Sequence, residues 1–241
     1  MTEKLLVVSA HTADWVWRCS GTIAKYLKAG AYVSVLCLTP GARSESDELW
    51  KNAEITLEEV KNIRREEAVS VAKQLGVSQI EVWDYDDCPL TAGPEILQRL
   101  NVKIRELRPT VIITHDACDC TNFDHDAANE IVSRALLMSR QAGIAAEGLA
   151  PVKNVQIYGM EPAQPELSGF VPRAYVDITD VFEEKKAAME CVKTQPRNPV
   201  RHTYVTALRG RQARVMPGGE GAEYAECFSV RFPVVVKDKL P

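Results

Sequence analysis

Side chains that could hold a metal ion are concentrated in two short segments of the chain. The sequence has only four histidines, and His11 is followed three residues later by Asp14, a spacing that lets an imidazole and a carboxylate converge on one point. His125 could supply a third ligand. Two histidines and one carboxylate with an open position are a common Zn²⁺ arrangement in hydrolytic and lyase sites. These residue types therefore raise the hypothesis of a zinc centre formed by His11, Asp14 and His125.

Each of these residues also has an ordinary structural interpretation. A histidine that follows a strand is commonly a hydrogen-bonded loop residue, and Asp14 could simply cap the next helix. His115 is a weaker candidate, because its nearness to Asp116 and Asp119 is equally consistent with solvated loop polarity. Cys118 and Cys120 form a single C-x-C, which two free thiols explain better than a thiolate site.

Short apolar runs alternate with helical patterns, which is typical of βαβ units around a mainly parallel sheet. Strands are predicted at Leu5–Ala10, Tyr32–Leu38, Ile80–Trp83, Thr110–Thr114, Val155–Tyr158, Ala174–Ile178 and Ala225–Val236. Helices are predicted at Gly21–Ala29, Thr56–Leu75 (with a Thr56/Glu59 capping box), Pro94–Leu107, about Asp126–Arg140 and Val181–Val192. No repeat or linker divides the sequence. We therefore predict one α/β, Rossmann-like domain over residues 1–241, with helices on both faces of the sheet.

The candidate ligands follow the predicted strands Leu5–Ala10 and Thr110–Thr114. In open α/β sheets, ligands bind beyond the carboxyl ends of the strands, so this edge is where a site is expected. Beyond a core of about 1–194, the chain is rich in Gly, Pro and Arg, and the extension 195–241 is expected to cover the site. Neither a G-x-G-x-x-G after the first strand nor a G-x-S-x-G motif is present, which argues against dinucleotide binding and nucleophilic acyl transfer.

Composition excludes several broad classes of protein. There are 29 Lys and Arg against 33 Asp and Glu, a net charge of −4, so no overall basic field indicates nucleic acid or an anionic membrane. The apolar runs are far shorter than the ~20 residues of a membrane span, and the first residues lack the apolar core of a signal peptide. Seven cysteines without a paired framework fit a reducing compartment. We therefore expect a cytoplasmic protein. We also expect a homo-oligomer, which is common among cytoplasmic enzymes.

Five short motifs are spread along nearly the whole chain. They are A-H-T-A-D at 10–14, G-T-I-A at 21–24, I-R-R-E-E-A at 63–68, N-F-D-H at 122–125 and Y-A-E at 224–226. In this order they resemble the PIG-L/LmbE-like zinc deacetylase superfamily, whose opening is A-H-P-D-D…G-G-T-I-A and whose later motif is H-P-D-H. The resemblance implies an LmbE-like fold, and it implies that His11, Asp14 and His125 are zinc ligands.

Two positions depart from the deacetylase pattern. The general base of those enzymes, an Asp just before the ligating Asp, is Ala13 here, and the first His of H-P-D-H is Asn122. One interpretation is an inactive deacetylase, and another is a retained zinc with altered chemistry. H-T-A-D-W-V-W-R and G-A-R-S-E-S resemble the 4-oxalomesaconate (4-carboxy-2-hydroxymuconate) hydratase branch and favour the second. That branch has E-P-H-Q-P-E where residues 161–166 have Ala163, which lacks a possible acid/base or substrate contact.

The hydratase resemblance implies addition of water to a tricarboxylate in gallate and protocatechuate catabolism. With Ala13 unable to accept a proton, Glu45 of G-A-R-S-E-S is the predicted acid/base, although an exposed loop acid explains it nearly as well on spacing alone. Asp124 is expected to orient a neighbouring side chain. Because guanidinium groups pair bidentately with carboxylates, the predicted substrate contacts are Arg18, Arg43 and Arg209, with Trp15, Asn122 and His202.

Three alternatives stay open at this point. Each arginine could be a surface charge, above all Arg211 and Arg214, and core packing is the safer assumption for at least one of the tryptophans. The function could be deacetylation of an N-acetylated sugar or thiol glycoside with another base. The chain could also be a non-catalytic module that binds a polycarboxylate without turnover.

Overall fold

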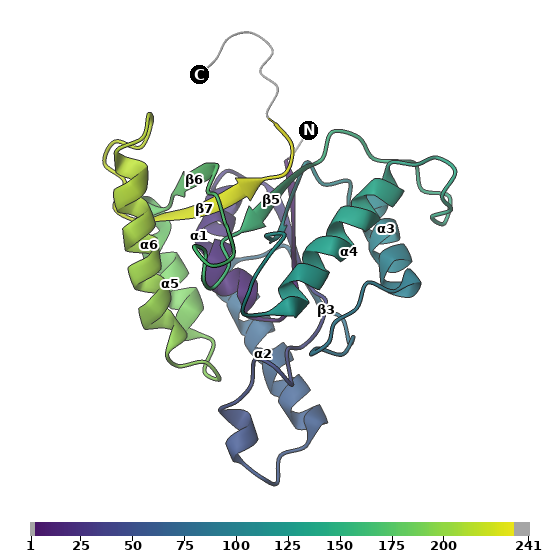
Figure 1. Ribbon diagram of the computed structural model, residues 1–241, viewed down its shortest axis with the longest axis horizontal. Helices are drawn as coiled ribbons and strands as arrows, with labels where there is room; N and C mark the ends of the chain where they lie inside the picture. The colour runs from purple at the N-terminus through teal and green to yellow at the C-terminus, as the bar shows by residue number, and fades with distance from the viewer. Residues whose placement is uncertain (1–2, 234–241) are drawn as a thin grey trace.

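A computed structural model describes residues 3–233, which form one mixed sheet with helices on both sides (Figure 1). The strands are β1 (Lys4–Ser9), β2 (Tyr32–Cys37), β3 (Gln79–Val82), β4 (Val111–His115), β5 (Gln156–Met160), β6 (Ala174–Asp177) and β7 (Ala225–Val230). The helices are α1 (Asp14–Lys28), α2 (Leu57–Leu75), α3 (Pro94–Leu107), α4 (Phe123–Ser139), α5 (Phe182–Glu190) and α6 (Asn198–Arg214), with 3₁₀ turns η1 (Leu49–Lys51) and η2 (Thr179–Val181). None of the helices within residues 3–233 has both the length and the apolar character needed to cross a membrane.

The sheet is buried on both faces, which explains the continuous apolar runs of its central strands. In β1, Leu6 and Val8 pack with α3 and α4, whereas Leu5 and Val7 pack on the opposite face with α1, α2 and α5. Strands β1 to β5 pair in parallel, and β7 runs antiparallel to β5 and β6. These relationships confirm the predicted α/β, mainly parallel fold with helices on both faces.

The strand order β3-β2-β1-β4-β5-β7-β6 reverses its direction between β1 and β4. The chain extends from β1 to β2 and β3 on one side, and from β4 to β5 on the other. Loops that leave two neighbouring strands at such a point diverge, and a crevice forms beyond their carboxyl ends. His11 follows β1, Glu45 follows β2 and Asn122 follows β4, so three loops bring polar side chains to this crevice.

Helix α1 begins at Asp14, well before the predicted start at Gly21. Its first half is buried on nearly all sides, including Trp15 and Val16, so it lacks the polar face that an amphipathic pattern requires. Asp14 is not the N-cap residue. Its carboxylate accepts a hydrogen bond from the backbone N–H of His11 at 2.8 Å, which turns Asp14 toward the end of β1.

Helix α4 begins at Phe123 rather than near Asp126. The side chain of Asn122 accepts a hydrogen bond from the backbone N–H of Asp124 and caps the helix. His125 therefore lies in the first turn of a helix and not at the end of a loop. A helical first turn fixes the direction of this side chain more firmly than a loop would.

Helix α6 is a further correction, because the sequence predicts no helix beyond Val192. The glycine and the β-branched residues of this segment have low helix propensity. The glycine at position 210 is explained by packing. A Cβ at Gly210 would overlap the backbone of Glu223, just before β7, so glycine lets α6 lie against that strand. In Figure 1, α6 lies beside α5 and crosses the end of β7.

Other boundaries differ less. The capping box of Thr56 and Glu59 is confirmed, and the C-cap of α2 is Gly76, which has a φ of 77°. Strand β7 ends at Val230, earlier than the predicted Ala225–Val236, of which residues 234–236 lie outside the described residues.

Candidate metal centre and adjoining cavity

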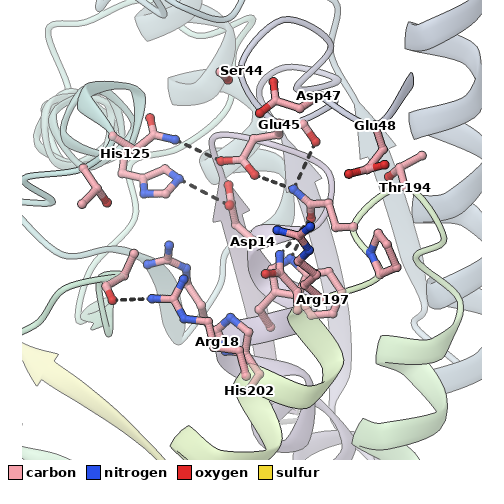
Figure 2. A pocket seen from close by; sticks show the side chains of 18 residues that line it. Asp14, Arg18, Ser44, Glu45, Asp47, Glu48, His125, Thr194, Arg197 and His202 are labelled. Carbon is pink, nitrogen blue, oxygen red and sulfur yellow. Dashed lines mark hydrogen bonds and ion pairs between the residues drawn. The ribbon is translucent and has the colours of Figure 1, made fainter. Parts of the chain in front are cut away.

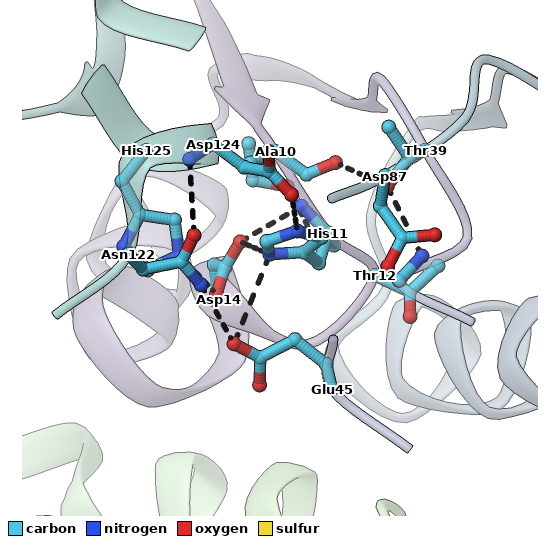
Figure 3. Close-up of polar contacts among 12 residues, drawn as sticks. Ala10, His11, Thr12, Asp14, Thr39, Glu45, Asp87, Asn122, Asp124 and His125 are labelled. Atoms are coloured by element: carbon cyan, nitrogen blue, oxygen red, sulfur yellow. Dashed lines mark hydrogen bonds and ion pairs between the residues drawn. The ribbon is translucent and has the colours of Figure 1, made fainter. Parts of the chain in front are cut away.

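Two histidines and one aspartate meet at the carboxyl ends of β1 and β4 (Figure 3). Nδ1 of His11 lies 3.2 Å from one carboxylate oxygen of Asp14, and Nε2 of His125 lies 3.3 Å from the other. All three side chains are buried, and neither nitrogen has a hydrogen-bond partner among residues 3–233. Two unpartnered imidazole nitrogens that face one carboxylate are a donor set that fits a divalent metal ion. The structure thus brings the three predicted ligands together.

The other ring nitrogen of each histidine is held by a buried carboxylate. Nε2 of His11 lies 3.1 Å from Asp124, and Nδ1 of His125 lies 2.9 Å from Asp119. Ionised carboxylates only accept hydrogen bonds, so both of these nitrogens act as donors. His11 therefore carries its hydrogen on Nε2, and His125 carries its hydrogen on Nδ1. The remaining nitrogens, which face Asp14, are then the ones free to bind a cation. Carboxylate–histidine pairs of this kind orient metal-bound imidazoles.

Both supporting carboxylates are themselves held in place. Asp124 accepts the backbone N–H groups of Cys88 and Leu90 at 2.8 and 2.7 Å, and Asp119 accepts the hydroxyl of Thr121 at 2.7 Å. Burial raises the pKa of both carboxyls, but the hydrogen bonds they accept outweigh it and lower both values. Asp124 thus orients a neighbour, as expected. The interpretation of Asp119 as solvated loop polarity is wrong, because this residue is 4% exposed.

Without a metal ion, His11 binds a proton. Burial lowers the pKa of His11, but the negative charge of Asp14, the hydrogen bond to Asp124 and the negative charge of Glu45 outweigh this and raise it to about 10. Burial likewise raises the pKa of Asp14, yet His125 and the other two histidines around it lower it well below its usual range. The site therefore carries a negative field that stabilises either a proton or a cation.

His115 lies behind the candidate ligands. Its ring stacks on His125 with centroids 4.0 Å apart, and its Nε2 accepts the backbone N–H of Ala10 at 3.0 Å. Burial, together with His125, lowers the pKa of His115 to about 3. This side chain is therefore a neutral ring that supports His125 and uses its Nε2 on the backbone.

Glu45 reaches the same space from the loop after β2 (Figures 2 and 3). Its Oε1 lies 3.9 Å from Nδ1 of His11. The Asn122 amide donates to Oε1 at 3.1 Å, and the Gln195 amide donates to Oε2 at 2.6 Å. Gly41, with a φ of 70°, permits this approach, because a Cβ there would lie 2.8 Å from that of His11. Glu45 is thus a held carboxylate beside the candidate ligands.

A cavity of about 330 Å³ opens in front of these side chains. Figure 2 shows Glu45 and His125 on one side of this space and Arg18 on the other. Arg197 and Arg201, at and just inside the start of α6, add two more guanidinium groups to the lining. A cavity whose lining combines the side chains of the candidate centre with three guanidinium groups suits a ligand with several carboxylates.

His202 and Ala163 complete the wall near Arg18. The His202 ring stacks on Trp17 with centroids 5.7 Å apart. Burial and the nearby cations, Lys185 first among them, lower the pKa of His202 well below its usual value, so the ring is neutral at neutral pH. The carbonyl of Ala163 accepts a hydrogen bond from Arg201 at 2.6 Å. This part of the wall has no side-chain acid or base at position 163.

Three of the predicted substrate contacts do not reach this cavity. Trp15 is fully buried in the core between α1 and the sheet. Arg43 is about half exposed, and its guanidinium lies 3.7 Å from Asp86. Arg209 pairs with Glu161 in a neighbouring cavity of about 220 Å³. Asn122 lines the main cavity, where its amide is bonded to Glu45.

Sequence reasoning missed four residues of the site, namely Asp119, Gln195, Arg197 and Arg201. Asp119 has no motif of its own, and only its place in the loop after β4 pointed to the site. Because α6 was not predicted, nothing indicated which polar residues of the extension would face the crevice.

Three comparisons show which known proteins this chain is similar to. The sequence matches the GlcNAc-PI de-N-acetylase (PIG-L) family over residues 6–136. It is 37% identical to 4-oxalmesaconate hydratase of Pseudomonas putida KT2440, over 98% of this chain and 92% of that protein. The crystal structure of GalB, the 4-carboxy-2-hydroxymuconate hydratase of that organism, superposes with a TM-score of 0.94 at 35% identity, covering 99% of this chain and 100% of that one.

A deacetylase shares the fold at greater distance. N,N'-diacetylchitobiose deacetylase of Pyrococcus horikoshii has a TM-score of 0.79 at 23% identity, over 95% of this chain and 83% of that one. The chain therefore belongs to the PIG-L family. Within that family it is similar over 98% of its length to a hydratase.

Proposed function

We propose that this chain is a hydro-lyase that adds water to 4-oxalmesaconate (4-carboxy-2-hydroxymuconate) to give 4-carboxy-4-hydroxy-2-oxoadipate, in gallate and protocatechuate catabolism. The similarity to the P. putida hydratase over 98% of the chain is the observation that carries this proposal. The site is compatible with it. Ala13, at the position of the deacetylase base, is buried and cannot accept a proton, whereas Glu45 faces the cavity.

The metal in this proposal is Zn²⁺, held by His11, Asp14 and His125. Their unpartnered nitrogens and shared carboxylate support this assignment, since zinc favours imidazole and carboxylate ligands. When bound, zinc supplies a Lewis acid that polarises an oxygen of the substrate or lowers the pKa of a water molecule. Asp124 and Asp119 keep the two imidazoles in the ligating orientation.

Glu45 is the proposed acceptor of the proton that the added water loses. Hydration of a conjugated acid requires a base for the water and a proton for the other alkene carbon. The two amides on Glu45 occupy one lone-pair direction of each oxygen and leave the carboxylate able to accept at the cavity. Arg18, Arg197 and Arg201 would bind the carboxylates of the substrate and fix the plane of the conjugated system.

An ultraviolet assay tests the proposal. Zinc-loaded protein is expected to remove the absorbance of the conjugated 4-carboxy-2-hydroxymuconate with a rate proportional to enzyme, and metal-depleted protein is expected not to. The same preparation is incubated with an N-acetylglucosaminide, and released acetate is measured. Acetate release with no loss of the conjugated acid would show that the chain is a deacetylase. Tight binding of the acid without turnover would show a binding module.

A further inference from the structure

Gln195 is bonded to Glu45 in two places. Its Nε2 lies 2.6 Å from Oε2 of Glu45 and 3.1 Å from the backbone carbonyl oxygen of the same residue. One amide thus holds both the side chain and the loop backbone of Glu45. We propose that Gln195 is a positioning residue that keeps the Glu45 carboxylate aimed at the cavity, an inference that rests on the proposed role of Glu45 in hydration.

Trp17 determines which way the Gln195 amide points. The indole Nε1 donates to Oε1 of Gln195 at 3.0 Å, and an indole N–H can only donate. If the amide were flipped, its NH₂ group would face the indole N–H and its oxygen would face the Glu45 carboxylate. Both contacts would be repulsive. The orientation of the amide in which Nε2 of Gln195 donates to Glu45 is therefore the favoured one.

The backbone next to Gln195 is anchored by a buried ion pair on α2. Glu67 accepts the backbone N–H of Thr194 at 2.8 Å and its hydroxyl at 2.7 Å, and Arg64 lies 3.0 Å from Glu67. Both charged side chains are almost entirely buried. They belong to the I-R-R-E-E-A motif, which contributes no residue to the cavity lining. The buried ion pair therefore holds the backbone at Thr194 in place, and from this backbone the Gln195 side chain reaches Glu45.

Loss of the Gln195 amide leaves Glu45 with the Asn122 bond on its side chain. The Glu45 side chain is 24% exposed, so there is space for another rotamer. Substrate carboxylates would still meet Arg18, Arg197 and Arg201, because the Gln195 side chain is hydrogen-bonded to Trp17, Glu45 and Asn198 and to none of these arginines. The expected signature is therefore a fall in kcat with little change in KM, since misplacement of a reacting group by about 1 Å can cost roughly 10²-fold.

The first measurement is steady-state hydration by Gln195→Met, with Gln74→Met as the matched control on the exposed side of α2. We expect kcat to fall about 10- to 100-fold, KM to stay within about twofold, and metal content to stay at the wild-type level. Trp17→Phe, which removes the indole N–H, is expected to move kcat in the same direction by a smaller factor. Unchanged kcat in Gln195→Met, or a rise in KM alone, would overturn the proposal.

A double-mutant cycle shows whether Gln195 acts through Glu45. In a Glu45→Gln background, Gln195→Met is expected to cause no further loss of kcat, because the group that it positions is already gone. Additive losses would refute a positioning role.

A crystal structure of Gln195→Met gives a readout independent of activity. A displaced Glu45 side chain is expected, and an unmoved one would refute the inference even if no hydration were detected. Failure of the wild-type protein to hydrate the acid would count against the proposed function, while this structural comparison would still test the contact itself.

Discussion

The Nδ1 atom of His125 and a carboxylate oxygen of Asp119 are 2.9 Å apart, and the same oxygen accepts the backbone N–H of Ala163 at 3.2 Å. One buried carboxylate therefore connects a candidate metal ligand to the wall of the cavity. Arg18 lies 3.5 Å from it as well. The orientation of the His125 ring and the shape of the cavity near Ala163 therefore depend on the same carboxylate.

Substitution Asp119→Asn tests this connection. The variant keeps the shape of the side chain but removes its charge, so His125 loses a strong acceptor and becomes a less basic ligand. We expect metal affinity to fall about 10- to 100-fold, the scale found when such supporting carboxylates are lost. Competition against a chromogenic chelator measures this. Asp180→Asn, at an exposed ion pair with Lys25, is the control. Wild-type affinity in Asp119→Asn would show that the carboxylate has no role in metal binding.

Substitution Glu45→Gln separates a catalytic role from a ligand role. A fourth-ligand role is the alternative, because a carboxylate oxygen of Glu45 lies within 4.8 Å of the candidate ligand atoms of His11, Asp14 and His125. As a proton acceptor, its loss is expected to reduce turnover by about 10²-fold or more while zinc content stays unchanged. Elemental analysis and the ultraviolet assay on one preparation decide between the roles. Loss of zinc together with activity would assign Glu45 to the metal, and normal turnover would remove it from the mechanism.

The apolar patterns of the sequence predicted the fold class, and residue spacing together with the family resemblance predicted the three candidate ligands. Strands buried on both faces give apolar runs that are visible without a structure, and turns after parallel strands gather at one edge. Helix α6 could not be recognised, because Gly210 is explained only by the nearby Glu223 backbone. Without that helix, no pattern indicated that Arg197 and Arg201 would face the site.

The misplaced contacts have a similar origin. Arg43 and Glu45 are two residues apart in one loop, and their order along the chain does not say which of them turns inward. The structure turns Glu45 toward His11 and Arg43 toward Asp86 at the surface. Trp15 likewise adjoins Asp14, but its position on α1 directs it into the core. Side-chain direction in a loop or first turn depends on long-range packing that local sequence does not encode.

The arginines of the cavity lining lead to a prediction about substrate binding. Arg197 and Arg201 are exposed at the start of α6 and line the cavity without contacting the candidate ligands. We expect Arg197→Gln and Arg201→Gln each to raise KM about tenfold with little change in kcat, since each removes a charged hydrogen bond made in ground state and transition state alike. Arg211→Gln, farther along α6, is the control. A fall in kcat at constant KM would instead place these arginines in the chemical step.

The proton on His11 leads to the last prediction, which concerns metal binding and pH. The pKa of His11 is raised to about 10 in the protein without metal, because Asp14, Asp124 and Glu45 outweigh the effect of burial. At pH 7 a metal ion must therefore displace a proton from Nδ1, so its affinity is expected to rise about tenfold per pH unit and to level off near pH 10. Isothermal titration of the protein with Zn²⁺ in buffers of different ionisation enthalpy counts the protons released, and about one is expected from this residue. His202→Gln is the control, because His202 is neutral and does not belong to the ligand set. A binding enthalpy that is the same in every buffer would show that His11 holds no proton for the metal to displace.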